Sequence, residues 1–276
     1  MDQVDVLVGL SELILHPEHT CEQMRQRFGV EYLPLVENPG EAGVAYEEDW
    51  LAIGDDAVLR IWYIPSQLDR GTVVYSMGTS GNMACYLFSA DLLRSSGWSV
   101  VMYDYEGYGG SGGTPYLGSL ARDLKAVVDW ARSRTGRPQV TLMGMSLGSI
   151  PSIAVAVERP EAVNGVILDS PVAMQAQIER FGFLVGGQTA ELIQRLDDEL
   201  LSDTLIARLE QPLLIFSHED DYLATPETVA VLYDRAVGPK QLVRFPELGH
   251  ATGQFAKTDA YLYYLDTFLA AVWAPR

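Results

Sequence analysis

Short apolar runs alternate with longer segments of helical periodicity along most of the chain. The apolar runs predict eight strands of about five residues each, at WLAI (50–53), VLRIWYI (58–64), TVVYSM (72–77), SVVMYDY (99–105), QVTLMG (139–144), GVILDS (165–170), PLLIFS (212–217) and QLVRFP (241–246). The helical pattern falls at 83–95, 119–135, 147–158, 226–236 and 254–273. Strand, helix and strand in series imply right-handed crossovers, so we predict an α/β fold: a mostly parallel sheet with helices on both faces.

Two segments depart from this alternation. The first two strands are separated only by the turn GDD at 54–56, which predicts an antiparallel hairpin at one edge of the sheet. After the strand that ends at Asp169, residues 171–210 carry an uninterrupted helical pattern. We interpret this insertion as a small helical cap above the carboxyl ends of the strands, where open α/β sheets bind ligands. The predicted organisation is an N-terminal extension at 1–44, packed on one core domain at 45–276.

Composition and charge narrow the classes of partner. The 276 residues are 48% hydrophobic and carry a formal net charge of −18, which repels phosphate backbones, so we expect no nucleic-acid partner. Two cysteines, Cys21 and Cys85, are expected to be free thiols. No apolar run is long enough to cross a bilayer, so the chain as it stands reads as soluble and cytoplasmic. The apolar first 15 residues leave a second reading open, a membrane-tethered or exported protein that has lost an N-terminal segment.

A glycine-flanked serine lies at the junction of a predicted strand and a predicted helix. Residues 144–148 read GMSLG, which is G-x-S-x-G, between the run at 139–143 and the helical pattern at 147–158. A sharp strand-to-helix turn lifts such a serine hydroxyl out of the sheet, and the glycines leave room for the turn. We therefore predict that Ser146 is a nucleophile.

A serine nucleophile needs a base, and four histidines are available. His16 and His19 precede every predicted strand, and His218 lies in or at the tip of a strand. His250 follows the last strand in the loop FPELGHATG and is the predicted base.

The base in turn needs a carboxylate. The loop HEDDYLATP after the seventh strand offers Glu219, Asp220 and Asp221. We predict Asp220 as the acid, with Asp221 as the next candidate and Asp169 as a weaker one. The resulting order of serine, acid and histidine matches that of α/β-hydrolases.

An oxyanion formed at the serine needs backbone donors. One is expected at Leu147, directly after the nucleophile. The second is expected in the loop MGTSGN, where Thr79 is preferred over Met77 and Ser80. Gly78 and Gly81 allow this loop to turn its amides inward.

These motifs resemble the α/β-hydrolase superfamily of the serine-nucleophile type, from about residue 45 to the C-terminus. DDAVLRIWYIP, VVYSMGTSGNM, VVMYDYEGYGGSGG, GMSLGS, ILDSP and the GH at 249–250 are similar to a compact branch that contains serine-aminopeptidase-like and depalmitoylase-like hydrolases. Many members of that branch are tethered to membranes, and ELILHPEH is similar to the stretch after the tether. The resemblance therefore implies possible membrane association through a missing anchor.

The sequence also departs from that branch. Ser76 and Met77 stand where relatives usually have a histidine before the glycine, which leaves the support of the oxyanion loop open. Glu106 stands where an arginine is common; it is either a surface charge or a carboxylate at the pocket mouth that disfavours anionic substrates. Met77, Phe181 and Phe183 are expected to line the substrate pocket, although apolar residues spaced like the two phenylalanines more often pack inside the lid.

The predicted function is hydrolysis of a small-molecule or acylated substrate, a carboxylic ester or thioester, through an acyl-enzyme. Two alternatives remain: an aminopeptidase or amidase on the same triad, and a non-catalytic binding protein with a hydrolase fold. The chain shows no metal-ligand spacing, Walker motif or dinucleotide fingerprint, so we expect no metal and no cofactor. The sequence does not predict the oligomeric state.

Overall fold

The computed structural model describes residues 3–29, 35–54, 57–182 and 189–275. All eight predicted strands are present, within a few residues of their expected limits. They are β1 (Glu47–Ile53), β2 (Ala57–Ile64), β3 (Thr72–Ser76), β4 (Ser99–Tyr103), β5 (Val140–Met145), β6 (Val163–Asp169), β7 (Leu213–His218) and β8 (Lys240–Phe245). They form one sheet in the order β1-β2-β4-β3-β5-β6-β7-β8.

The hairpin prediction is confirmed at the β1 edge of the sheet. β1 pairs with β2 in antiparallel register from Glu47 opposite Tyr63 to Ile53 opposite Ala57. β2 is also antiparallel to β4, whereas β4, β3, β5, β6, β7 and β8 run parallel. Parallel strands end at the same edge, so the loops after β3, β5, β6, β7 and β8 converge there.

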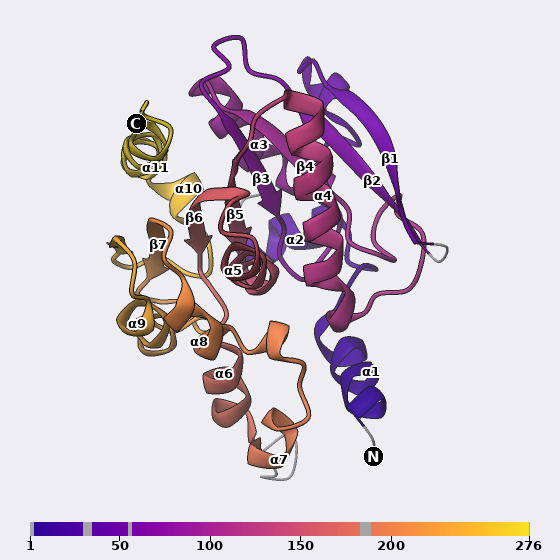
Figure 1. Ribbon diagram of the computed structural model, residues 1–276, viewed down its shortest axis with the longest axis vertical. Helices are drawn as coiled ribbons and strands as arrows, with labels where there is room; N and C mark the ends of the chain where they lie inside the picture. The colour runs from indigo at the N-terminus through magenta and orange to yellow at the C-terminus, as the bar shows by residue number, and fades with distance from the viewer. Residues whose placement is uncertain (1–2, 30–34, 55–56, 183–188, 276) are drawn as a thin grey trace.

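The connecting helices fall where the sequence predicts them. They are η2 (Met83–Tyr86) with α3 (Leu87–Ser95), α4 (Leu120–Thr135), η4 (Ser146–Gly148) with α5 (Ser149–Glu158), and α9 (Pro226–Arg235). The last pattern is split into α10 (Gly253–Ala256) and α11 (Thr258–Val272), because Lys257 leaves helical geometry at φ −135° and ψ 44°. A short helix η3 (Leu117–Ser119) precedes α4. Figure 1 shows these helices flanking the sheet.

Burial explains why the strands read as continuous apolar runs. Every residue of β3, β4, β5, β6 and β7 is buried, as expected for parallel strands covered on both faces. β1 is mostly exposed, which fits an antiparallel strand at the edge. The core is therefore centred on the strands whose carboxyl ends carry the predicted site.

The N-terminal segment packs against the loop after β3. It contains α1 (Gln3–Ile14), α2 (Cys21–Phe28) and η1 (Pro39–Ala42). The amide of His16 donates to the Thr79 carbonyl at 3.0 Å, and the amide of Gly81 donates to the His16 carbonyl at 3.1 Å. No helix in the described part of the chain is both long and apolar enough to cross a membrane.

The two cysteines form a disulfide, so the expectation of free thiols is wrong. Cys21 at the start of α2 is bonded to Cys85 in η2. The two residues are 64 positions apart, and only the packing of the N-terminal segment on the core brings them together. Spacing along the sequence could not show this.

The insertion at 171–210 is helical, with α6 (Met174–Arg180), α7 (Thr189–Ile193), η6 (Asp198–Leu200), α8 (Ser202–Leu205) and η7 (Ile206–Arg208). The Asp203 carboxylate accepts from the amides of Gln175 and Ala176 at 2.9 and 3.1 Å, which holds α8 to the start of α6. Arg180 donates to the carbonyl of Tyr222 at 2.8 Å. In Figure 1, α6 and α7 project beyond the carboxyl ends of the strands.

Candidate active site

Ser146 lies at a tight turn between β5 and α5. Its φ of 50° is in the left-handed region, which costs a non-glycine residue free energy unless the surroundings enforce it. A Cβ on Gly144 would lie 2.7 Å from the Ser149 Cα and closer still to the Gly148 carbonyl group. A Cβ on Gly148 would lie 2.7 Å from the Met77 carbonyl oxygen. Both glycines of the motif are therefore required by close backbone packing.

His250 lies after β8 and is hydrogen-bonded to Asp221. Its Nδ1 lies 3.0 Å from Oδ1 and 2.8 Å from Oδ2 of that carboxylate. His250 is 7% exposed and Asp221 is 2% exposed. An Nδ1 that donates to a carboxylate leaves Nε2 as the nitrogen that can take up a proton.

The expectation that Asp220 holds the histidine is wrong. β7 ends at His218, and the Asp221 amide turns back to the His218 carbonyl at 3.2 Å, which directs Asp221 inward. Asp220 is exposed on the outside of this turn. The sequence cannot distinguish neighbouring carboxylates on one loop, because a shift of the turn by one residue changes which carboxylate is buried.

The environment of Asp221 favours its ionised form. Burial acts to raise the pKa of the Asp221 carboxyl, but hydrogen bonds from His250, Ser170 and Ala224 outweigh burial and leave the pKa below its usual value. The amides of Leu223 and Ala224 each donate to Oδ1 at 2.9 Å. A carboxylate held in this way can orient His250 and stabilise its protonated form.

A buried serine and a second histidine support Asp221. The Gly253 amide donates to Nε2 of His218 at 3.0 Å, so Nδ1 of this neutral ring carries the hydrogen and donates to Ser170 Oγ at 3.0 Å. Burial lowers the pKa of His218 to about 4, which keeps the ring neutral at pH 7. Ser170 Oγ also accepts from the Ala251 amide at 2.9 Å, so its own hydrogen is left for Asp221. Ser170 has a φ of 49°.

Asp169 lies beside this network and does not bond to His250. Tyr261 donates its hydroxyl hydrogen to Oδ2 of Asp169 at 2.8 Å, while Oδ1 is buried without a hydrogen-bond partner. Burial raises the pKa of Asp169 to about 7. The alternative of Asp169 as the acid is therefore not supported by the geometry.

Tyrosine hydroxyls support the loop after β3. The sequence left this support open, because Ser76 and Met77 stand where relatives usually have a histidine. Ser76 shares a hydrogen bond of 2.9 Å with the Tyr103 hydroxyl. Hydroxyls of three more tyrosines donate to carbonyls of the loop: Tyr105 to Met77 at 2.6 Å, Tyr108 to Thr79 at 3.0 Å and Tyr86 to Ser80 at 2.9 Å. These bonds fix the directions of the three carbonyls. They therefore also fix the orientation of the backbone amides that lie between these carbonyls.

Gly78 in this loop packs directly on the serine, since a Cβ there would lie 3.7 Å from the Ser146 Cβ. Gly78 and Thr79 both line the cavity that contains Ser146. The Leu147 and Thr79 amides remain predicted as the oxyanion donors.

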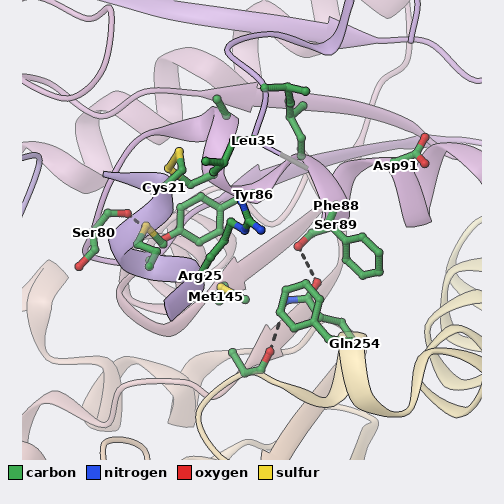
Figure 2. A pocket seen from close by; sticks show the side chains of 18 of the residues that line it. Cys21, Arg25, Leu35, Ser80, Tyr86, Phe88, Ser89, Asp91, Met145 and Gln254 are labelled. Carbon is green, nitrogen blue, oxygen red and sulfur yellow. Dashed lines mark hydrogen bonds between the residues drawn. A yellow bond between two sulfur atoms is a disulfide. The ribbon is translucent and has the colours of Figure 1, made fainter. Parts of the chain in front are cut away.

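A cavity of about 220 Å³ contains both Ser146 and His250. Its described lining is largely apolar and comes mainly from four segments, joined by Ile64, Met145, Ser146 and Leu223. The segments are the N-terminal segment (including Met24, Leu35, Val36, Pro39 and Val44), the loop at 78–80, residues 84–91, and residues 250–255 after β8. Figure 2 shows this lining, with Tyr86 and Met145 near its centre and Gln254 bonded to Ser89.

Of the pocket residues predicted from sequence, Met77 and Phe181 are absent from the described lining of this cavity. Met77 is buried in the core and is 1% exposed. The ring of Phe181 lies 4.8 Å from the Arg180 guanidinium instead. Phe183 lies outside the described residues. None of the described residues at 171–210 lines the cavity, and the N-terminal segment takes the position that we expected for the cap.

Glu106 and the cluster of His16, Glu18 and His19 both lie outside the described lining of the cavity. Glu106 accepts from Arg122 at 2.5 Å, so of its two readings the structure favours the surface charge. Among the described residues, His16, Glu18 and His19 can supply metal ligands, since their ligand atoms lie within 4.8 Å of one another. We did not expect this cluster, which is partly exposed and lies outside the cavity lining.

The sequence contains signals for the supporting residues that our prediction missed. Ser170 and His218 are polar residues at the carboxyl ends of β6 and β7, where site residues gather in a parallel sheet. The tyrosines of DYEGYG follow β4, at the same edge. Their partners are backbone carbonyls, which no side-chain pattern reveals.

Comparison with known proteins supports this architecture. A family model described as serine aminopeptidase, S33, matches residues 67–206. The chain is 29% identical to the uncharacterized protein YfhR of Escherichia coli O157:H7 over 205 residues, which is 71% of this chain and 70% of that one. It is 25% identical to the α/β hydrolase domain-containing protein WAV2 of Arabidopsis thaliana, over 76% of this chain and 72% of that one. An uncharacterized membrane protein of Saccharomyces cerevisiae is 26% identical, over 78% and 77%.

Solved structures share the fold at low identity. The Pyrococcus furiosus esterase Pf2001 superposes with a TM-score of 0.70 at 18% identity, covering 87% of this chain and 95% of that one. Est1E from Butyrivibrio proteoclasticus, solved with ferulic acid, superposes with a TM-score of 0.69 at 18% identity, covering 82% and 100%. At this identity the likeness concerns the fold.

Proposed function

Because the chain belongs to the serine aminopeptidase S33 family of α/β hydrolases, we propose that it hydrolyses carboxylic esters or thioesters through an acyl-enzyme on Ser146. One observation carries the proposal. A serine at a left-handed turn lies in the same apolar cavity as a histidine whose Nδ1 is bonded to a buried, ionised aspartate. These are the parts that nucleophilic acyl transfer requires.

Each group has a definite task in this reaction. His250 Nε2 takes the proton of the Ser146 hydroxyl as the oxygen attacks the carbonyl carbon, and then gives it to the leaving group. Asp221 stays ionised and stabilises the imidazolium. Backbone amides of Leu147 and of the loop at 78–80 stabilise the oxyanion. Water, deprotonated by the same histidine, then releases the acid and frees the serine.

The lining favours an ester or thioester over the N-terminus of a peptide. An aminopeptidase must bind an α-ammonium group, for which a carboxylate in the cavity is suited. Asp91 is the one carboxylate among the described lining residues, and it accepts from Arg94 at 2.9 and 2.7 Å. Arg25 and Arg27 line the same cavity and would repel an ammonium group.

Hydrolysis of p-nitrophenyl butyrate by the wild type and by Ser146→Ala tests the proposal. We expect turnover to fall by about 10³ to 10⁶ in the variant, because the nucleophile is lost. Ser95→Ala removes an exposed serine on α3 and serves as the matched control. Retention of most activity in folded Ser146→Ala would contradict the proposal, and a wild type inert toward esters, thioesters and aminoacyl amides would favour a non-catalytic binding protein.

A further inference from the structure

The N-terminal segment brings a cation into the cavity. α2 is fastened beside the loop after β3 by the Cys21–Cys85 disulfide, and Cys21, Met24, Arg25 and Arg27 of this helix all line the cavity. In Figure 2, Arg25 lies in the same group of side chains as Tyr86 and Met145. The helix therefore presents a guanidinium to the cavity that contains Ser146.

Several other polar groups of the lining have partners within the protein. Asp91 accepts from Arg94, and Ser89 donates to Gln254 at 2.6 Å. The Arg27 guanidinium lies 3.4 Å from the Tyr222 hydroxyl. Ser80 shares a hydrogen bond of 2.9 Å with His19.

Arg25 differs from these groups. Among the described residues, its buried Nε has no hydrogen-bond partner and no carboxylate forms an ion pair with it. A buried donor without an acceptor costs free energy, and more when the donor is charged. An oxyanion is the partner that a guanidinium accommodates best, through two parallel hydrogen bonds. A bound anion would therefore supply the hydrogen-bond acceptor that Arg25 Nε lacks among the described residues.

We propose that Arg25 binds a negatively charged oxygen group of the substrate, so that the enzyme prefers esters that carry a carboxylate away from the scissile bond. The proposal rests on the proposed function, because the anion is part of the ester that Ser146 attacks. The cavity volume of about 220 Å³ lies below the range of about 300–1,000 Å³ for drug-sized ligands, which suits a short acyl chain. The net charge of −18 opposes any anion, so a preference for one has to come from a local cation.

Matched pairs of aryl esters test this inference. The first pair carries the charge on the acyl part: p-nitrophenyl hydrogen glutarate against p-nitrophenyl pentanoate. The second carries it on the leaving group: 4-butyryloxybenzoate against its methyl ester. We expect the wild type to favour the charged member of at least one pair in kcat/KM, and Arg25→Gln to reduce that preference by about tenfold or more, mainly through KM. Arg25→Lys retains the charge but cannot donate two parallel hydrogen bonds as a guanidinium does, so it should keep part of the preference for the charged ester.

Arg244→Gln is the control for the change in net charge, because Arg244 is exposed on β8 and does not line the cavity. It should leave the preference in both pairs as in the wild type. If Arg25→Gln does not fold, Arg25→Lys decides instead: a preference for the charged ester equal to that of the wild type would overturn the role of the Arg25 guanidinium.

The two proposals fail in different ways. An equal preference in the wild type and Arg25→Gln, with hydrolysis still dependent on Ser146, would overturn the role of Arg25 and leave the proposed function standing. A wild type that hydrolyses neither member of either pair would overturn both.

Discussion

Single residues decide whether the candidate site can work, and Asp221 is the clearest example. It accepts from the amides of Leu223 and Ala224, from His250 and from Ser170, which itself accepts from His218. Each donor favours the ionised carboxylate, and together they offset the cost of burying it. The orientation of the His250 ring therefore depends on a network that extends over two strand ends and two loops.

Replacing the two neighbouring aspartates separates the acid from its neighbour. Asp221→Asn should lower kcat for p-nitrophenyl butyrate by about 10⁴, because the amide cannot hold the required tautomer or stabilise the imidazolium. Asp220→Asn is the matched control and should change kcat less than about threefold, because Asp220 is exposed. Initial rates at pH 7.5 check both, and a larger loss in Asp220→Asn would reassign the acid.

Asp169 gives the stability of the protein a dependence on pH. Its pKa is raised to about 7 in the folded state, so the folded state binds this proton more tightly than the unfolded state does. Its contribution is fully present below about pH 4 and is lost as the pH rises to about 7. Asp169→Asn cannot ionise and keeps an acceptor for Tyr261.

We therefore expect the free energy of unfolding of Asp169→Asn to exceed that of the wild type by about 2–4 kcal/mol at pH 8, and to match it near pH 4. Urea denaturation at several pH values measures the difference. A difference that does not vary with pH would show that folding does not raise the pKa of Asp169.

The sequence predicts some of these residues and not others. Ser146 is identified by its motif and the strand before it, and His250 by its place after the last strand; the structure brings both to one cavity. Asp221 was only the second choice, because the direction of a turn decides between adjacent carboxylates. Arg25 carries no signal in the sequence, since its place in the cavity wall comes from the long-range packing of α2.

At the scale of elements, α2 lies tightly against the loop that supports the serine. A Cβ on Gly81 would lie 2.6 Å from Met24 Sδ and 2.7 Å from Cys85 Sγ, so no larger residue fits between α2 and η2. The disulfide joins these two elements directly. α2 therefore forms part of the cavity wall together with the core.

Removing the disulfide should lower the stability of the protein. Closing a loop of 64 residues restricts the unfolded chain, and Cys21→Ser with Cys85→Ser should lower the free energy of unfolding by about 2–4 kcal/mol. Urea denaturation without reductant compares the double variant with the wild type. Dithiothreitol should destabilise the wild type and leave the double variant unchanged; equal stability of both proteins would contradict this account.

The strands were predictable because burial on both faces produces continuous apolar runs, and the helices because their patterns are long. The segment that forms the wall of the pocket could not be predicted from the sequence. We assigned it to the insertion at 171–210, whereas the described lining includes α2 and residues at 35–44 and none of the described residues of the insertion. Helical periodicity shows that a segment is amphipathic but not which surface it covers.

At the scale of the whole molecule, the strand order places the loops after β3, β5, β7 and β8 at one edge, and the site is assembled from these loops. Parallel strands that end at one edge bring together Ser146, Asp221 and His250, which lie far apart in the sequence. The N-terminal segment then closes the cavity from outside the part of the chain that matches the family model. The family match thus covers the proposed nucleophile Ser146, whereas Asp221, His250 and the N-terminal segment lie outside it.

Reaction with a fluorophosphonate probe at pH 7.5, followed by peptide mass spectrometry, tests the central claim most directly. The account predicts one modified residue, Ser146, in the wild type, and labelling slowed at least about a hundredfold in Asp221→Asn, because the serine must be deprotonated by an oriented His250. An unmodified Ser146 in a folded protein that still hydrolyses esters, or a label on a different serine, would contradict the account.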